Sequence, residues 1–165
     1  MNINLQMLHS YEGNYKNNLF FEKYSNWKNS DYSNIIYLHI IRVLRRQLIS
    51  SQDLLQDSEG KPIKSIKLSI PDLLGINRSS IVIKILLSVQ HVYEIRINTE
   101  YRKERILFYP SSSQSSAIMT FYFDKQSGND LTDILAKETE DIYLGNINST
   151  MISALKERWK IWLLI

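Results

Sequence analysis

The sequence predicts an α+β fold built around a winged helix-turn-helix, with an added strand and a long C-terminal helix. Three observations favour this fold. A glycine separates two segments with helix-start signals in residues 69–90 (SIPDLLGINRSSIVIKILLSVQ), an alternating strand precedes them, and a hairpin with a basic turn follows them. The order of helix, strand, short helix, glycine turn, helix and hairpin is that of a winged helix.

The first helix is expected to begin near Asp31. Ser33 can cap its N-terminus, and apolar residues recur at helical spacing through residues 36–48. Residues 50–62 are rich in turn-forming side chains and predict a loop, whereas residues 63–69 (IKSIKLS) alternate like a half-buried strand. Three basic residues interrupt the apolar stripe of the helix on its outer side, where a solvated face is the simpler interpretation: Arg42, Arg45 and Arg46.

The two helices of the reading motif are predicted from their boundary residues. Ser69 can cap a short helix, and Pro71 falls in its first turn, where a missing N–H costs nothing. Gly75 supplies the positive φ that ends the short helix, and Asn77 caps a second helix over residues 78–90.

The remaining elements follow in order. Strands at residues 92–98 and 105–109 form the wing, and residues 117–124 (AIMTFYFD) form the added strand. A short helix is expected over residues 130–136, and a last helix over residues 149–165. The predicted organisation is an N-terminal arm (1–30), a winged-helix domain (31–148) and a C-terminal linker helix (149–165).

The second helix of the motif is apolar around most of its circumference, which leaves few side chains to discriminate base edges. We therefore expect contacts to the DNA backbone, made by this helix and the wing. Surplus apolar surface on the same helix predicts dimerisation, unless neighbouring strands bury it. The predicted DNA-binding residues are Asn77, Arg78, Ser79, Ser80, Lys84, Arg102, Lys103 and Arg105; those predicted for dimerisation are Ile81, Ile83 and Leu87.

Composition limits the other classes of function. The net charge of +3 and a pI near 9.0 permit nucleic-acid binding without requiring it. Cysteine is absent, the apolar runs are too short for a membrane span, and no signal peptide is recognisable, so we expect a cytoplasmic protein. His9, His39 and His91 are far apart, and no phosphate-binding glycine motif is present. We predict no catalytic residue, metal or cofactor.

Residues 33–165 resemble the first winged-helix domain of plasmid replication initiators that bind repeated origin sequences. The resemblance rests on KSIKLSIPDLLGINRSSIVIKILLSV, on IMTFYFDKQSG and on IYLGNINSTMISALKERWKIWLLI. It implies a domain that provides dimerisation and backbone contacts, duplex DNA with repeated sites as ligand, and host replication proteins as further partners. It also implies that a second winged helix follows this one.

Two other functions fit the same pattern. The first is a self-contained transcription regulator with the layout of MarR-type repressors, in which terminal helices build a permanent dimer. The second is a winged helix used only for protein–protein contacts, because its polar face is sparse. Footprinting distinguishes the initiator, which should protect direct repeats, from the repressor, which should protect an inverted repeat.

Overall fold

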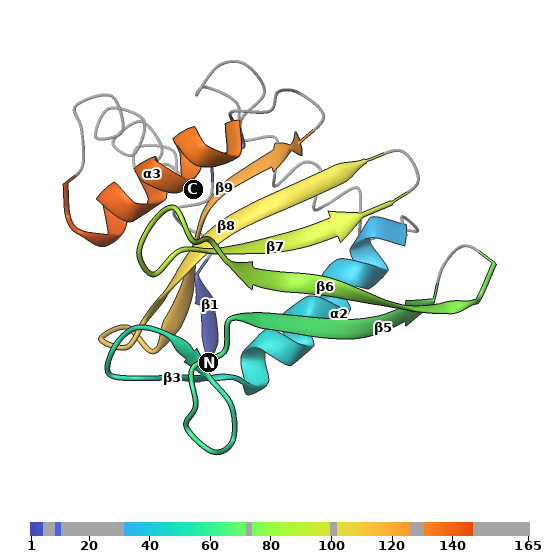
Figure 1. Ribbon diagram of the computed structural model, residues 1–165, viewed down its shortest axis with the longest axis horizontal. Helices are drawn as coiled ribbons and strands as arrows, with labels where there is room; N and C mark the ends of the chain where they lie inside the picture. Colours follow the sequence, from blue (N-terminus) through green and yellow to red (C-terminus); the bar gives the residue numbers. More distant parts are fainter. Residues whose placement is uncertain (5–8, 11–31, 72–73, 100–101, 126–130, 147–165) are drawn as a thin grey trace, which may run out of the picture.

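Five antiparallel strands in chain order form the centre of the protein. The computed structural model describes residues 1–4, 9–10, 32–71, 74–99, 102–125 and 131–146. Each of the five strands pairs with the next, and the turns between them alternate between the two ends of the sheet (Figure 1). They are β5 (Ser65–Pro71), β6 (Asn77–Ile85), β7 (Tyr93–Asn98), β8 (Lys103–Ser111) and β9 (Ser116–Asp124).

The β9 side of the sheet is extended by strands from the N-terminus. Strand β1 (Asn2–Asn4) and strand β2 (His9–Ser10) both pair with β9 in parallel, so β9 is not a free edge. At the other side, β5 is the last strand of the sheet. Strands β3 (Leu48–Ile49) and β4 (Leu55–Gln56) form a separate two-stranded sheet.

Helix α2 (Tyr32–Arg46) covers one face of the large sheet. Its apolar residues recur every three or four positions, so they form one stripe that packs on alternate residues of the strands. Tyr93, Ile95 and Ile97 of β7 point to this face and are fully buried. The helix contributes Ile36, Tyr37, Ile40, Ile41 and Leu44 to this core.

Helix α3 (Leu131–Tyr143) packs on the opposite face, over β8 and β9. Leu107 and Phe121, which are paired across these strands, lie against Leu135 and Ala136 of the helix, and all four are buried. Strand β8 therefore has a core on both faces, which explains its almost continuous run of buried residues.

The predicted winged helix-turn-helix is wrong, although the α+β class is right. The described residues between 69 and 90 form the end of β5, the whole of β6 and the turn into β7. Gly75 does adopt a positive φ of 78°, but it belongs to the connection between two strands. Neither of the two helices in the described part of the chain belongs to a helix-turn-helix.

Most of the other expected elements are confirmed. The first helix, the strand near residues 63–69, the hairpin and the strand near residues 117–124 are present as α2, β5, β7–β8 and β9. The helix predicted at residues 130–136 is α3, which continues to Tyr143. Most of the N-terminal arm and the helix predicted at residues 149–165 lie outside the described residues.

Candidate functional site

The β5–β6 hairpin projects beyond the rest of the sheet, on the side where the β7–β8 turn also lies (Figure 1). Asn77, Arg78, Ser79 and Ser80 are all exposed here. These four residues were predicted to bind DNA from a helix, and the structure places them instead on the projecting part of β6. They pair there with residues 68–71 of β5.

The pairing register decides which side chains of the hairpin share a face, because directly paired residues point to the same side. Lys67 pairs with Ile81, and Lys84 pairs with Ser65. Residues 65 and 67 are two positions apart on β5 and therefore point to the same side. Lys67 and Lys84 thus lie on the same face, away from α2, and both are exposed. Arg78 pairs with Ile70, which belongs to the α2 core, so this arginine starts from the other face.

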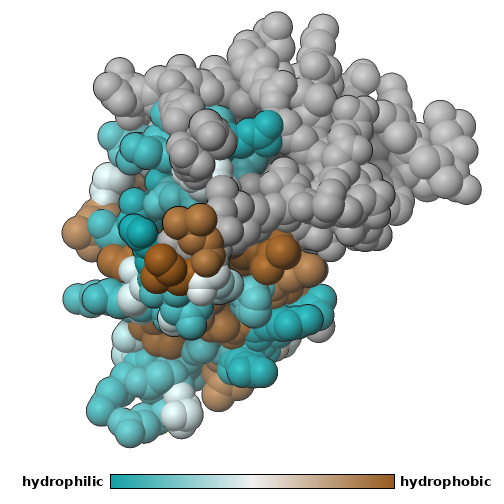
Figure 2. Space-filling view, turned by 90° about the vertical axis from the view of Figure 1, so that its right-hand side faces the viewer, coloured by the Kyte–Doolittle hydropathy of each residue, from teal (hydrophilic) through white to brown (hydrophobic). Residues whose placement is uncertain are grey.

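The described end of the hairpin is apolar. Leu74 is 83% exposed and Ile76 is 54% exposed, which is high for large aliphatic side chains. Figure 2, which views the molecule from the side to which the hairpin projects, shows apolar surface gathered among hydrophilic atoms. The hairpin therefore combines polar and basic strands with an apolar end.

The β7–β8 turn presents a second pair of basic residues. Arg102 and Lys103 are exposed, as predicted for a wing. The turn is closed by hydrogen bonds between Thr99 and Arg102: the Thr99 N–H donates to the Arg102 carbonyl at 2.9 Å, and the Arg102 N–H donates to Thr99 Oγ1 at 3.1 Å. Arg102 also lies 3.9 Å from the buried Glu104 carboxylate.

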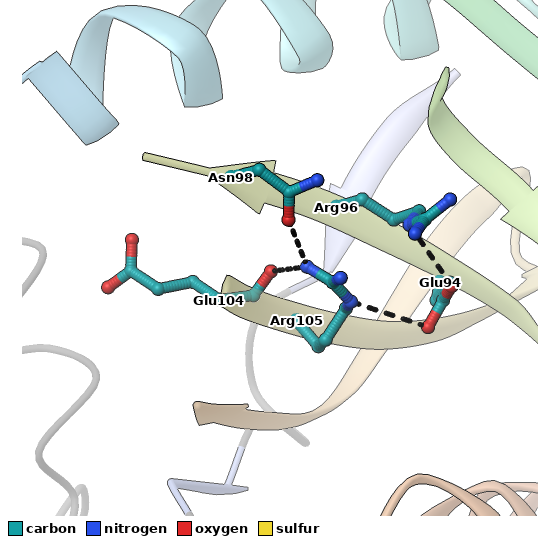
Figure 3. Close-up of polar contacts among 5 residues, drawn as sticks. All are labelled: Glu94, Arg96, Asn98, Glu104 and Arg105. Atoms are coloured by element: carbon teal, nitrogen blue, oxygen red, sulfur yellow. Dashed lines mark hydrogen bonds and ion pairs between the residues drawn. The ribbon is translucent and has the colours of Figure 1, made fainter. Parts of the chain in front are cut away.

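Arg105, the third basic residue predicted for the wing, is 2% exposed and is held in a polar cluster on the face away from α2 (Figure 3). Its Nη1 donates to Asn98 Oδ1 and to the Glu104 carbonyl, both at 2.8 Å. Its Nε lies 3.7 Å from Glu94 Oε2, and Arg96 Nε lies 3.4 Å from Glu94 Oε1. Arg105 is therefore not positioned on an open surface beside Arg102 and Lys103.

The residues predicted for dimerisation do not form one surface. Ile83 is fully buried in the α2 core, Ile81 is half-buried, and Leu87 is 86% exposed in the turn after β6. A β-bulge in β6 places Val82 and Ile83 together in that core. Dimerisation itself stays a prediction, but Ile83 cannot take part in an interface without opening the core.

A polar cluster at the other end of the sheet joins four segments. Asp53, in the loop between β3 and β4, accepts hydrogen bonds from the N–H and hydroxyl of Ser112 and from Tyr143 Oη, the N–H at 2.7 Å and the phenol at 2.9 Å. His91 Nδ1 lies 3.3 Å from the Asp53 carbonyl oxygen, and its ring lies tilted against that of Tyr143, with the ring centroids 4.7 Å apart.

The hydrogen bonds of the cluster around Asp53 suit a structural role better than a catalytic one. Burial opposes ionisation of Asp53, but the bonds from Ser112 and Tyr143 outweigh it and lower the pKa of the carboxyl. A serine nucleophile needs its hydroxyl directed to a base such as histidine. Here the Ser112 hydroxyl donates to Asp53, so the arrangement ties the β8–β9 turn to the loop.

In the described part of the chain, no group of three or more His, Asp or Glu side chains is placed to hold a metal ion. None of the described helices is long and apolar enough to cross a membrane.

Sequence reasoning did not single out Lys67, Glu94 or Arg96. The alternation of YEIRIN already places Glu94, Arg96 and Asn98 on one face of β7. The four-residue turn then fixes the register that sets Arg96 opposite Arg105.

Comparisons of the chain with protein-family models, with curated proteins and with solved structures find no match. The resemblance to replication initiators stays a prediction. The helix-turn-helix that was its main structural support is replaced by the β5–β6 hairpin.

Proposed function

We propose that this protein binds duplex DNA through the phosphate backbone, with the β5–β6 hairpin as the principal contact. The major groove admits a two-stranded ribbon as well as a helix, and several DNA-binding proteins use strands in this way. The observation that supports the proposal is a projecting hairpin whose exposed strand residues, apart from Pro71, are basic or small and polar.

The distribution of charge along the sequence favours the same part of the chain. Residues 32–46 and 64–85, which form α2 and the hairpin, hold seven of the 20 Lys and Arg residues and one of the 17 Asp and Glu residues. The rest of the chain therefore holds thirteen basic and sixteen acidic residues. The net charge of +3 is therefore concentrated in α2 and the hairpin, whereas the remainder is mildly acidic, and a local positive excess favours binding to nucleic acid.

The side chains suit phosphates better than bases. Lys67, Lys84 and the hydroxyls of Ser79 and Ser80 can donate to phosphate oxygens. Of the side chains that commonly form paired hydrogen bonds with a base edge, the described part of the hairpin offers Asn77 and Arg78. We therefore expect DNA binding that depends strongly on salt concentration and weakly on base sequence.

The decisive experiment measures the salt dependence of DNA affinity. Each lost phosphate contact reduces the slope of log affinity against log salt by about 0.9. The double variant Lys67→Gln/Arg78→Gln should therefore flatten the slope by about 1.8 units. Lys137→Gln on α3, a neutralised exposed lysine that lies outside the hairpin, is the matched control and should leave the slope unchanged.

Two outcomes contradict the proposal. If the double variant keeps the wild-type slope, the hairpin is not the interface. If the wild-type protein does not bind duplex DNA at about 50 mM salt, the function itself is wrong, because nonspecific electrostatic binding is strongest there. The initiator role remains a narrower prediction, supported only if footprinting shows protection of direct repeats.

A second candidate function, binding of another protein molecule, is favoured by the exposed Leu74 and Ile76. If the apolar end instead inserts between base steps, as in minor-groove proteins, Leu74→Asn/Ile76→Asn should weaken DNA binding without changing the salt slope. If it is a protein contact, the same variant should leave DNA affinity unchanged and abolish self-association in sedimentation.

A further inference from the structure

We propose a phosphate-binding site at the arginine pair Arg96 and Arg105, on the sheet face away from α2. The two residues are directly paired across β7 and β8, so their side chains leave the same face about 5 Å apart at Cβ. Like charges at such positions repel each other, and a buried guanidinium is costly unless it is fully paired. The pair therefore needs a compensating anion.

The described residues supply less negative charge than the pair requires. Among the described residues, Glu94 is the carboxylate that contacts both arginines, with one oxygen toward each, and neither contact is a hydrogen bond. Asp124 also attracts Arg105 electrostatically, but Lys84, which pairs with Glu94 from β6, adds another positive charge beside that carboxylate. The cluster thus keeps a positive excess in a partly buried place.

Unused donors point to the same conclusion. Among the described residues, neither Arg96 Nε nor Arg105 Nε has a hydrogen-bond partner, although both atoms are buried. Buried donors without partners are uncommon in folded proteins and call for a water, an ion or a ligand. The Arg96 side chain is 27% exposed, which gives an anion a route to the pair.

A phosphate is the anion that fits these donors best. Guanidinium groups present planar, fork-shaped donors that match phosphate oxygens and bind them more strongly than neutral donors do. The phosphate can belong to a nucleic-acid backbone or to a free phosphate or small phosphorylated molecule. The site goes beyond the proposed hairpin interface, since it requires no contact between the hairpin and DNA.

The test is titration of the whole chain with inorganic phosphate at constant ionic strength, held with chloride, and followed by thermal unfolding. Phosphate should raise the unfolding temperature of the wild-type protein, whereas chloride alone should not. Arg96→Gln should weaken phosphate binding about 10-fold to 100-fold, as expected for the loss of a charge-assisted bond. Arg96→Lys keeps the positive charge but loses the fork-shaped donors of the guanidinium group. Its affinity for phosphate should lie between those of the wild-type protein and Arg96→Gln.

Glu94→Gln gives a test with the opposite sign. Removing the carboxylate that competes for the two arginines should tighten phosphate binding, a gain that a purely structural role of Glu94 does not produce. No phosphate response in the wild-type protein, an equal response in Arg96→Gln, or no gain in Glu94→Gln would each overturn the site. Far-ultraviolet circular dichroism establishes that each variant is folded before it is scored.

The source of the phosphate is distinguished with a duplex oligonucleotide. If Arg96→Gln reduces the salt slope of DNA binding by about 0.9, the ligand is a backbone phosphate. If it leaves DNA binding unchanged while inorganic phosphate binding is lost, the ligand is a free phosphate or a small phosphorylated molecule. Lys67→Gln/Arg78→Gln should keep the response to inorganic phosphate, so failure of the hairpin proposal and failure of this site are separable.

Discussion

Asp53 should be the side chain whose removal most affects the end of the sheet opposite the hairpin. Its carboxylate accepts three hydrogen bonds, two from Ser112 and one from Tyr143, so it connects a loop to a β-turn and to the end of α3. Its backbone adopts a positive φ of 55°, which asparagine and glycine tolerate and alanine does not. Three substitutions therefore separate the two effects: Asp53→Asn, Asp53→Gly and Asp53→Ala.

The expected losses follow from these contacts. At about 1 kcal/mol net for each hydrogen bond, Asp53→Gly should lower the free energy of unfolding by about 3 kcal/mol. Asp53→Ala loses the same bonds and adds about 1 kcal/mol of backbone strain, for about 4 kcal/mol in total. Asp53→Asn keeps the shape and one acceptor but loses the charge, so about 1 to 2 kcal/mol is expected.

The loss in Asp53→Asn should also depend on pH. The pKa of Asp53 is lowered in the folded protein, because the hydrogen bonds outweigh the effect of burial. The ionised carboxylate therefore stabilises the fold fully above the unfolded pKa of about 4, and this contribution disappears as pH falls through the lower folded pKa. Urea unfolding from pH 7 to pH 2.5 should show wild type and Asp53→Asn converging. A gap that stays constant across this range, or a loss below about 1 kcal/mol in Asp53→Ala, would refute the role of this cluster.

Three further predictions concern other parts of the molecule. Leu44→Ala on α2, a fully buried side chain, should cost about 2 to 5 kcal/mol in chemical unfolding, and a smaller loss would show that the helix is not firmly packed. Thr120→Val should cost about 1 to 3 kcal/mol, because it removes a partner of the buried Thr139 hydroxyl at 2.8 Å; equal stability by calorimetry would argue against that bond. Arg102→Gln/Lys103→Gln should flatten the salt slope of DNA binding by about one to two units, and an unchanged slope would exclude the β7–β8 turn from the interface.

The segment at residues 69–90 shows where sequence reasoning failed. Its second half contains Ile81, Val82, Ile83 and Ile85, and β-branched side chains favour strands over helices. The alternation that identifies a strand was obscured by the bulge, which places Val82 and Ile83 together in one core. An apolar pattern without a clean period of two then resembled an apolar helix. The lack of a substantial polar face was the available sign that the segment was a strand.

Elements with local signals were predicted well. The repeated apolar spacing of α2 and the alternation in β7 depend only on neighbours in sequence, so both were recognised. The burial of Arg105 depends on pairing between strands and on a carboxylate eleven positions earlier in the chain. An arginine near a hairpin turn is expected to be exposed. Whether it is exposed depends on the register of the strands and on the residues that share its face of the sheet. Arg102 and Arg105, three residues apart, consequently differ in surroundings.

The basic residues of the hairpin also have a competing explanation, protection of a sheet edge. Strand β5 ends the sheet, and lysine and proline on such strands hinder pairing with other chains. Lys67 and Pro71 fit this explanation. Arg78 fits it as well, because β6 pairs with β7 only over residues 83–85, so at Arg78 this strand is paired with β5 alone. Edge protection and phosphate contact therefore both account for basic residues on the two strands of the hairpin. Arg78→Gln alone distinguishes them: loss of about 0.9 units of salt slope supports DNA contact, and new aggregation at unchanged slope supports protection.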